Sequence, residues 1–375
     1  MARNWPAGSS NPSSRAMPSA RPRMRVKGVC YDAGVVMGVN WRPVFDRRTV
    51  RRELEIIRDD LHCNAVRLCG HSLSRLSFAA EAALSQGLAV WFSPQLWNRT
   101  ARGSVGYLMR AAERLEALRE RWPDRVVLSV GWEVSLFSRG IIPGRSLAAR
   151  MSSPQLLPIV KSGQHKTRVN AYLSEVVAAI RKVYRGRITY ASLVWEGVDW
   201  TPFDYVGVDH YRSSKIEDRY VEMLRPALAT GKPVAITEFG YEAMENGPMS
   251  EGFLDSAGLK PSVINVRSQL LHQLPLVGRF IRPRLAGAHV RDEGYQARKL
   301  LEQLEILEKA GVDGTFVATF LSQITPYDPD PRFDLDMASS SLVRYLEHGH
   351  GSTYPDMPWE PKAAFRAVAK YYAEH

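Results

Sequence analysis

Short apolar runs rich in β-branched and aromatic residues recur eight times along the chain, and stretches with apolar residues at helical spacing lie between many of them. Runs of the first kind are typical of buried strands, and strands that alternate with helices form parallel sheets. The predicted strands cover residues 25–34, 65–70, 88–97, 126–133, 188–196, 205–211, 233–240 and 314–323. The clearest predicted helices cover residues 49–61, 74–86, 107–121, 169–184 and 292–310. Eight strands in this alternation predict an α/β fold, a closed (β/α)8 TIM barrel, rather than an open doubly wound sheet.

The length and composition fit one large barrel. A chain of 375 residues with 45% hydrophobic residues can bury a large core, and barrels of this kind often form a single large domain. The sequence contains no apolar run of 18 residues, the length that would predict a membrane span. No glycine-rich phosphate-binding motif follows a predicted strand. We therefore expect residues 25–375 to form a single barrel domain.

The first 24 residues differ in composition from the rest of the chain. Six of the eleven net positive charges precede Asp32, the first acidic residue, and most of them lie in a segment rich in proline and serine. This segment lacks the apolar stretch of a secretory signal. We expect residues 1–24 to form a disordered basic tail, solvated rather than bound to nucleic acid.

The three cysteines, Cys30, Cys63 and Cys69, lie in or near apolar runs and lack the spacing of a zinc site. This pattern predicts reduced core thiols in a cytoplasmic protein. The sequence indicates no metal site and defines no oligomeric state.

Two segments interrupt the alternation of strands and helices: residues 136–166 after the fourth strand, and about 241–290 after the seventh. Both leave the carboxyl ends of strands, where barrel enzymes build their active sites. We expect both to border a cleft and the second to form a lid. Its possible flexible points are Gly247, Gly252, Gly258 and Gly278. The alternative interpretation is a peripheral insertion unrelated to substrate.

Two glutamates end predicted strands that face each other across a closed barrel. Glu133 ends the fourth strand in "SVGWEVS", and Glu238 ends the seventh in "PVAITEFG". Paired carboxyl groups with unequal surroundings suit glycoside hydrolysis, because one must donate a proton while the other stays ionised. The pair therefore predicts a glycoside hydrolase that acts on a carbohydrate substrate and requires no cofactor.

These motifs resemble those of the clan A retaining glycoside hydrolases, which are (β/α)8 barrels. "ITEFG" is similar to that clan's nucleophile strand, "NAVRLCG" to its second strand and "VDHYR" to its sixth. The resemblance implies that Glu133 is the acid/base and Glu238 the nucleophile, with Arg67 and Tyr211 in contact with Glu238. More loosely, the whole chain resembles an actinobacterial barrel family often labelled "abortive infection protein".

The implied roles are physically consistent. An ionised Glu238 needs a nearby cation and hydrogen-bond donors, which Arg67 and Tyr211 supply. Glu133, near a negative Glu238 and beside the indole of Trp132, is expected to have a raised pKa and to stay protonated until the glycosyl-enzyme forms.

Further polar and aromatic residues lie at the predicted strand ends. Asp32, Asp209 and His210 are either hydroxyl ligands or structural polar groups, and Glu196 is a rival acid or a sugar hydroxyl ligand. Aromatic residues suited to stack on a sugar ring are Trp41, Trp97, Trp132, Trp195, Trp200, Tyr211 and Tyr241. We expect two or three of them to contact substrate, and the others to seal the top of the barrel.

Two positions depart from the clan A pattern. Trp132 occupies the place of the usual asparagine before the acid/base, and the eighth strand, "GTFVATFLSQ", lacks the usual tryptophan. An indole cannot reproduce an amide, so we expect a sugar without a conventional contact to its 2-hydroxyl. In the alternative, Trp132 points into the barrel wall and Glu196 or Gln95 replaces the asparagine. A non-catalytic carbohydrate-binding or regulatory barrel is the second functional hypothesis.

Overall fold

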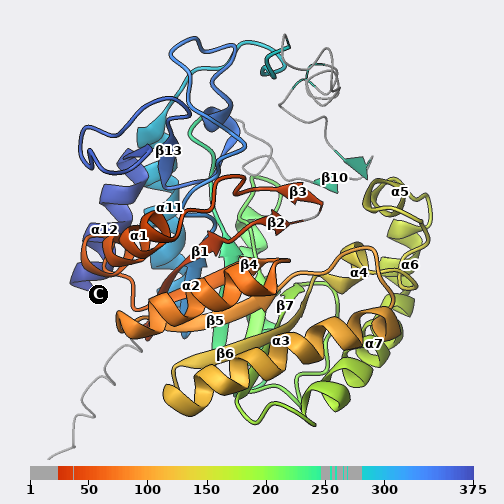
Figure 1. Ribbon diagram of the computed structural model, residues 1–375. Helices are drawn as coiled ribbons and strands as arrows, with labels where there is room; N and C mark the ends of the chain where they lie inside the picture. Colours follow the sequence, from red (N-terminus) through yellow and green to blue (C-terminus); the bar gives the residue numbers. More distant parts are fainter. Residues whose placement is uncertain are drawn as a thin grey trace, which may run out of the picture.

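The chain forms a closed barrel of eight parallel strands (Figure 1). The computed structural model describes residues 24–36, 38–245, 254–255, 258–259, 265, 268 and 281–375. The barrel strands are β1 (Val26–Asp32), β4 (Ala65–Gly70), β5 (Ala89–Pro94), β6 (Val126–Trp132), β7 (Arg187–Leu193), β8 (Val206–Asp209), β9 (Val234–Phe239) and β12 (Gly314–Val317). They follow one another around the barrel in chain order, and β12 pairs with β1 to close it. Each predicted strand overlaps one of these strands, which confirms the predicted (β/α)8 barrel.

Helices pack on the outside of the barrel. The five predicted helices correspond to α1 (Arg47–Asp59), α2 (Leu73–Ser85), α3 (Ala101–Arg121), α7 (Gln164–Ile180) and α11 (Glu293–Lys309), and the layer also contains α8 (Tyr220–Leu228) and α12 (Ala363–Glu374). Side chains cap several of their first turns. The Asp46 carboxylate accepts from the Thr49 amide at 2.7 Å at the start of α1, and Asp292 accepts from the Tyr295 amide at 2.7 Å at the start of α11.

The connection between β7 and β8 differs from the other βα units. Residues 194–205 are all described, and they form turns rather than a helix. The Lys232 ammonium donates to the carbonyl oxygens of Trp200 and Thr201 at 2.8 and 2.9 Å and holds this connection in place. A cavity of about 400 Å³ lies between the connection and α8, on the outer side of the barrel. Neither proposed catalytic glutamate lines this cavity, so it is separate from the barrel mouth.

The insertion predicted after the fourth strand is present. Three short helices follow β6 before α7 begins: α4 (Val134–Phe137), α5 (Leu147–Met151) and α6 (Leu156–Ser162). They lie on the right in Figure 1.

The segment between β9 and α11 contains the predicted lid, most of which lies outside the described residues, including Gly247, Gly252 and Gly278. A short antiparallel pair within it, β10 (Leu254–Asp255) and β11 (Gly258–Leu259), is described and includes Gly258. Two other small hairpins flank the barrel: β2 (Val35–Val36) with β3 (Val39–Asn40), and β13 (Val343–Tyr345) with β14 (Trp359–Pro361). Residues 1–23 of the predicted tail are outside the described part.

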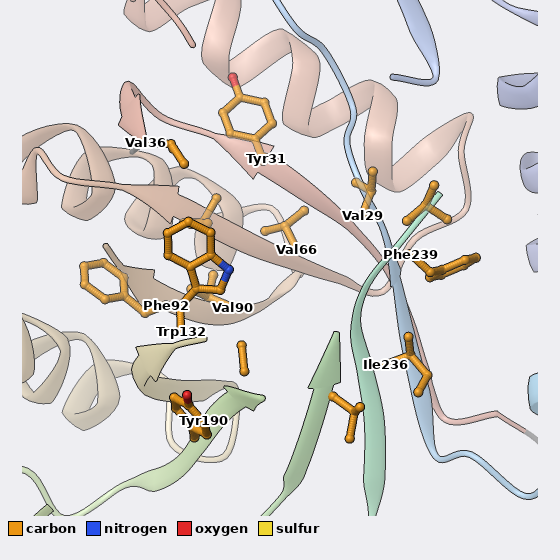
Figure 2. Close-up of a cluster of buried hydrophobic side chains, with 14 of the residues drawn as sticks. Val29, Tyr31, Val36, Val66, Val90, Phe92, Trp132, Tyr190, Ile236 and Phe239 are labelled. Atoms are coloured by element: carbon orange, nitrogen blue, oxygen red, sulfur yellow. The ribbon is translucent and has the colours of Figure 1, made fainter. Parts of the chain in front are cut away.

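Apolar side chains form two layers, because successive residues of a strand point to opposite faces. The barrel interior holds Cys30, Ala65, Trp91, Val127, Ala235, Phe316 and Ala318. The larger layer lies between the strands and the helices, and Figure 2 shows part of it, with Val66, Phe92, Trp132 and Ile236. Full burial of such a side chain contributes about 1.5–3 kcal/mol.

The cysteines are all buried and carry no disulfide, as predicted. In the described part of the chain, no group of three or more His, Cys, Asp or Glu side chains is placed to hold a metal ion. None of the described helices is both long and apolar enough to span a bilayer.

A bulge at the end of β9 determines where Glu238 points. The pairing of β9 with β8 shifts register between Val208 and Asp209. Ala235 faces the barrel interior, so strict alternation would turn Glu238 toward the outer layer. Bulges redirect side chains, and here both Thr237 and Glu238 bond to groups at the barrel mouth.

Candidate active site

Glu238 is held by two partners at the carboxyl end of the barrel. Its Oε1 atom forms a salt bridge with Nη1 of Arg67, and its Oε2 atom accepts from the Tyr211 hydroxyl at 3.3 Å. The Arg67 side chain is only 1% exposed and also donates to the Thr237 carbonyl oxygen at 3.2 Å. The structure therefore brings together the three residues that the sequence motifs had grouped.

Glu133 lies on a tight turn between β6 and α4. Its backbone is left-handed, with φ 36° and ψ 50°, and its amide donates to the Ala191 carbonyl oxygen at 2.8 Å. A non-glycine residue in this region costs about 1–3 kcal/mol, and such positions cluster at functional sites. The pKa of Glu133 is raised well above its ordinary value, first by burial and then by the negative charges of Asp209 and Glu238. This direction agrees with the sequence argument and favours a protonated Glu133.

Glu196 stabilises the turn that carries Glu133. Its side chain is fully buried, and its two carboxyl oxygens accept from four donors. The donors are the Ser135 amide at 2.9 Å, the Tyr190 hydroxyl at 2.7 Å, the Ser192 hydroxyl at 3.0 Å and the Leu193 amide at 3.1 Å. A sugar hydroxyl or a leaving oxygen cannot reach this carboxyl group. The structure thus corrects the expectation that Glu196 binds substrate or competes as the acid.

Two further carboxyl groups lie close to the glutamates. Asp209 accepts from the Thr237 hydroxyl at 2.5 Å, and its pKa is raised well above the ordinary value by burial and by the charge of Glu238. Asp32 accepts from the Thr319 hydroxyl at 2.9 Å, and burial is the main cause that raises its pKa to about 6. The strand-end pattern predicts both aspartates as polar groups near the mouth but does not indicate the two threonines. For Thr237 the available signal was its position two residues after the inward-facing Ala235.

His210 lies on the outer face of the barrel, not at its mouth. Its ring stacks on Tyr220 with 4.0 Å between centroids, and its Nε2 atom lies 2.9 Å from the Tyr220 carbonyl oxygen. Burial lowers the pKa of His210 to about 4, which leaves the ring neutral at pH 7. The expectation that His210 binds a sugar hydroxyl is corrected, because its neighbours Asp209 and Tyr211 take the inward positions.

Trp132 also points away from the mouth. Figure 2 shows it within the outer apolar layer, and its ring stacks on Phe137 with 3.7 Å between centroids and 11° between planes. Only 8% of the residue is exposed, so it is not placed to stack on substrate as expected. The alternative interpretation, an indole in the barrel wall, fits this position. Of the two suggested replacements for the asparagine, Gln95 remains, since its Oε1 atom has no hydrogen-bond partner among the described residues.

Among the other aromatic residues, Trp97 has the clearest position beside the mouth. It follows β5, lines a cavity of about 310 Å³ and packs edge-on against His71, with 5.4 Å between centroids. Trp41, Trp195 and Trp200 pack against the outer layer, as Trp97 also does, and Tyr241 is only 2% exposed. Trp97 is therefore the predicted ring-stacking residue that the structure places best.

No model of a protein family matches the chain, and no curated protein matches it. Solved structures match its fold. A GH113 β-1,4-mannanase aligns with 94% of this chain and 100% of its own, with a TM-score of 0.56 and 14% identity. The GH113 β-mannanase AaManA from Alicyclobacillus acidocaldarius aligns with 95% of this chain and 98% of its own, with a TM-score of 0.52 and 14% identity. A GH2 β-galacturonidase from Eisenbergiella tayi, bound to galacturonate, aligns with 94% of this chain and 52% of its own, with a TM-score of 0.51 and 16% identity.

These neighbours are TIM-barrel glycoside hydrolases of clan A, so their fold agrees with the clan A resemblance of the sequence motifs. At 14–16% identity the similarity shows the fold alone. None of the comparisons supports the looser resemblance to barrels labelled "abortive infection protein".

Proposed function

We propose that the protein is a retaining glycoside hydrolase in which Glu238 is the nucleophile and Glu133 the acid/base. The observation that carries the proposal is the contrast between two carboxyl groups at one barrel mouth. Glu238 pairs with the buried Arg67 guanidinium, whereas burial and negative neighbours raise the pKa of Glu133. A double displacement requires this contrast between an ionised nucleophile and a protonated acid. The TIM-barrel glycosidases with the same fold support this class of reaction.

In the first step, a carboxylate oxygen of Glu238 attacks the anomeric carbon while Glu133 gives its proton to the leaving oxygen. The bond between the anomeric carbon and that oxygen breaks, its electron pair stays with the oxygen, and a glycosyl ester forms on Glu238. Arg67 and Tyr211 orient the attacking carboxylate, because each of them binds one of its oxygens.

In the second step, water hydrolyses the ester. Esterification removes the charge of Glu238, one of the charges that raise the pKa of Glu133, so Glu133 becomes a better base. It takes a proton from the attacking water, the anomeric carbon regains its first configuration, and Glu238 is released as a carboxylate.

A non-catalytic carbohydrate-binding barrel is the second candidate. The observation that favours it is Trp132, whose burial in the outer layer leaves no amide at the place of the usual asparagine. Loss of a hydrogen bond to the 2-hydroxyl removes part of a transition-state stabilisation worth several kcal/mol together with ring distortion.

Hydrolysis of 2,4-dinitrophenyl glycosides distinguishes the two candidates. The whole chain is assayed on the mannoside, glucoside, galactoside, glucuronide and galacturonide, and the product is followed by NMR. We expect turnover of at least one compound with retention of anomeric configuration. The matching 2-deoxy-2-fluoro glycoside should label Glu238, as read by mass spectrometry of peptides.

Glu238→Gln should lower turnover by about 10⁴-fold or more, as loss of a catalytic nucleophile does elsewhere. Glu222→Gln is the matched control, because Glu222 is exposed on α8. Inversion of configuration would contradict a covalent role for Glu238. Saccharide binding without turnover of any compound would favour the non-catalytic barrel.

A further inference from the structure

A pocket with several arginines lies over the ends of β4, β5 and β6. One cavity of about 310 Å³ is lined by His71, Leu96, Trp97, Asn98, Arg99 and Arg139. A second cavity of about 260 Å³ shares Trp97 and Asn98 with the first and extends to Arg150. We refer to the two cavities together as the arginine pocket.

The chain segments that follow β5 and β6 build this pocket. The Asn98 amide donates to the Phe137 carbonyl oxygen at 2.6 Å, and the Arg139 amide donates to the Arg99 carbonyl oxygen at 2.9 Å. Asn98 Oδ1 accepts from Arg139 Nε and from Arg150 Nη1, both at 3.1 Å. A single neutral oxygen thus holds two guanidinium groups close to each other.

The positive charge of the pocket is not balanced within the described part of the chain. Arg139 and Arg150 bond to neutral oxygens, and no described carboxylate forms a salt bridge with them or with Arg99. Arg150 is 1% exposed, and its pKa is lowered by burial and by the charge of Arg139. Burying a guanidinium beside another cation is costly unless an anion compensates it.

The start of α3 adds to this positive potential. The helix runs for 21 residues from Ala101, and its first turn carries Arg102 and no acidic residue. The positive end of a helix dipole is destabilised by a cation and stabilised by an anion. The Thr100 hydroxyl caps this end by accepting from the Gly103 amide at 3.2 Å, and an anion in the pocket would add to that stabilisation.

We propose that the arginine pocket binds a negatively charged group of the carbohydrate substrate, a carboxylate or a sulfate or phosphate ester, while Trp97 stacks on the sugar ring that carries it. This inference rests on the proposed glycosidase function and specifies its substrate class. Guanidinium groups bind such anions through paired N–H donors, and an aromatic ring beside them covers the apolar face of a sugar. Glu133 follows β6 directly, and Arg139 follows α4 in the same connection, so the proposal puts the charged unit on the side of the leaving group.

A matched series of methyl glycosides tests the proposal without turnover. The probes are the methyl β-glycosides of glucose, galactose and mannose, together with the corresponding uronide, 6-sulfate and 6-phosphate of each, all titrated into the whole chain by ligand-observed NMR. In at least one series we expect a charged member to bind about tenfold tighter than its neutral parent, a difference of about 1.4 kcal/mol. The preference should weaken as salt is raised. The member that binds best distinguishes a uronate from a sulfate or phosphate ester.

Arginine variants show whether this pocket is responsible. The double variant Arg99→Gln with Arg139→Gln should reduce the preference for the charged probe to within about twofold, and its thermal midpoint should be unchanged because both side chains are exposed. Arg114→Gln, an exposed arginine further along α3, should keep the preference. Equal binding of charged and neutral probes in every series would overturn the proposal, as would a preference that survives in the double variant. Because the readout is binding, a preference for a charged probe stands even if no glycoside is hydrolysed.

Discussion

Two glutamates of the same chemical type have opposite surroundings at the barrel mouth, and single neighbouring residues create the difference. The buried guanidinium of Arg67 forms a salt bridge with Glu238, whereas the charged neighbours that affect Glu133 most are Asp209 and Glu238. A carboxyl group that is buried beside anions holds its proton more tightly, which raises the pKa of Glu133.

The pH dependence of turnover should report the proton on Glu133. Because the acid must be protonated, kcat/KM should fall as pH rises through the raised pKa of Glu133. Glu133→Gln should remove this alkaline limb and slow substrates with poor leaving groups by about 10²–10⁴-fold. Formation of the glycosyl-enzyme from a 2,4-dinitrophenyl glycoside should persist, since that leaving group needs no proton. An alkaline limb that survives in the variant would assign the acid to another residue.

Asp32 should make the fold less stable as pH rises. Its pKa of about 6 in the folded chain lies roughly two units above that of an unfolded aspartate, a difference of about 3 kcal/mol at most. A raised folded-state pKa contributes stability that is complete below about pH 4 and is lost as pH rises through about 6.

Asp32→Asn keeps an oxygen for the Thr319 hydroxyl and has no charge to bury. The unfolding free energy, measured by chemical denaturation, should therefore fall less between pH 4 and pH 7.5 for the variant than for the parent. The exposed Asp218→Asn is the control. A variant that is less stable than the parent at pH 7.5 would show that the charged form of Asp32 is favoured by the fold.

At the scale of single elements, the β6–α4 turn is stabilised by β7. The Tyr190 hydroxyl accepts from the Val134 amide at 2.7 Å and donates to Glu196 at 2.7 Å. Glu196 in turn accepts from the Ser135 amide. These bonds fix the two residues that follow Glu133 and offset the cost of its left-handed backbone.

Glu196→Gln should disturb this turn and lower turnover without removing a reacting group. An amide nitrogen in place of one carboxyl oxygen leaves at least one of the four donors unpaired, at a cost of about 1–3 kcal/mol. A small displacement of Glu133 should then lower kcat by about 10²-fold with little change in KM. Glu113→Gln, on the exposed face of α3, should change neither stability nor kcat. If Glu196→Gln raised KM alone, Glu196 would contact substrate.

Element patterns also explain what could be predicted from the sequence. β-branched runs predicted the eight strands and helical spacing predicted five helices, because each of these elements buries one continuous apolar face. Alternation along a strand also predicts that Trp132 and His210 point outward. Both were expected to contact substrate because every polar or aromatic residue at a strand end was taken to point inward. The β9 bulge is different. Strict alternation from Ala235 would turn Glu238 outward, whereas the register shift and the salt bridge with Arg67 show that it faces the mouth. The helix-free β7–β8 connection likewise depends on tertiary contacts, such as that of Lys232 with Trp200.

At the scale of the whole molecule, the barrel closes where the first and last strands meet. β1 pairs with β12, and the C-terminal helix α12 covers this seam and packs against α11. The Tyr372 hydroxyl donates to the Gly28 carbonyl oxygen at 3.1 Å, and the Lys27 ammonium donates to the Tyr372 carbonyl oxygen at 2.8 Å. Chain ends more than 300 residues apart are therefore joined directly.

Because of this closure we expect residues 24–375 to unfold as one cooperative unit. We also expect Tyr372 to contribute to the unfolding free energy of the whole unit. Because β1 has no complete set of partners until β12 is in place, scanning calorimetry should show a single transition. Tyr372→Phe keeps the buried ring and removes its bond to Gly28, so it should lower the unfolding free energy by about 1 kcal/mol and the midpoint by roughly 1–2 °C. Tyr371→Phe is the matched control, since its hydroxyl bonds to Glu308 on α11 rather than to the strand seam. A second transition that Tyr372→Phe leaves unchanged would show that part of the chain, such as the segment between β9 and α11, folds independently of the barrel.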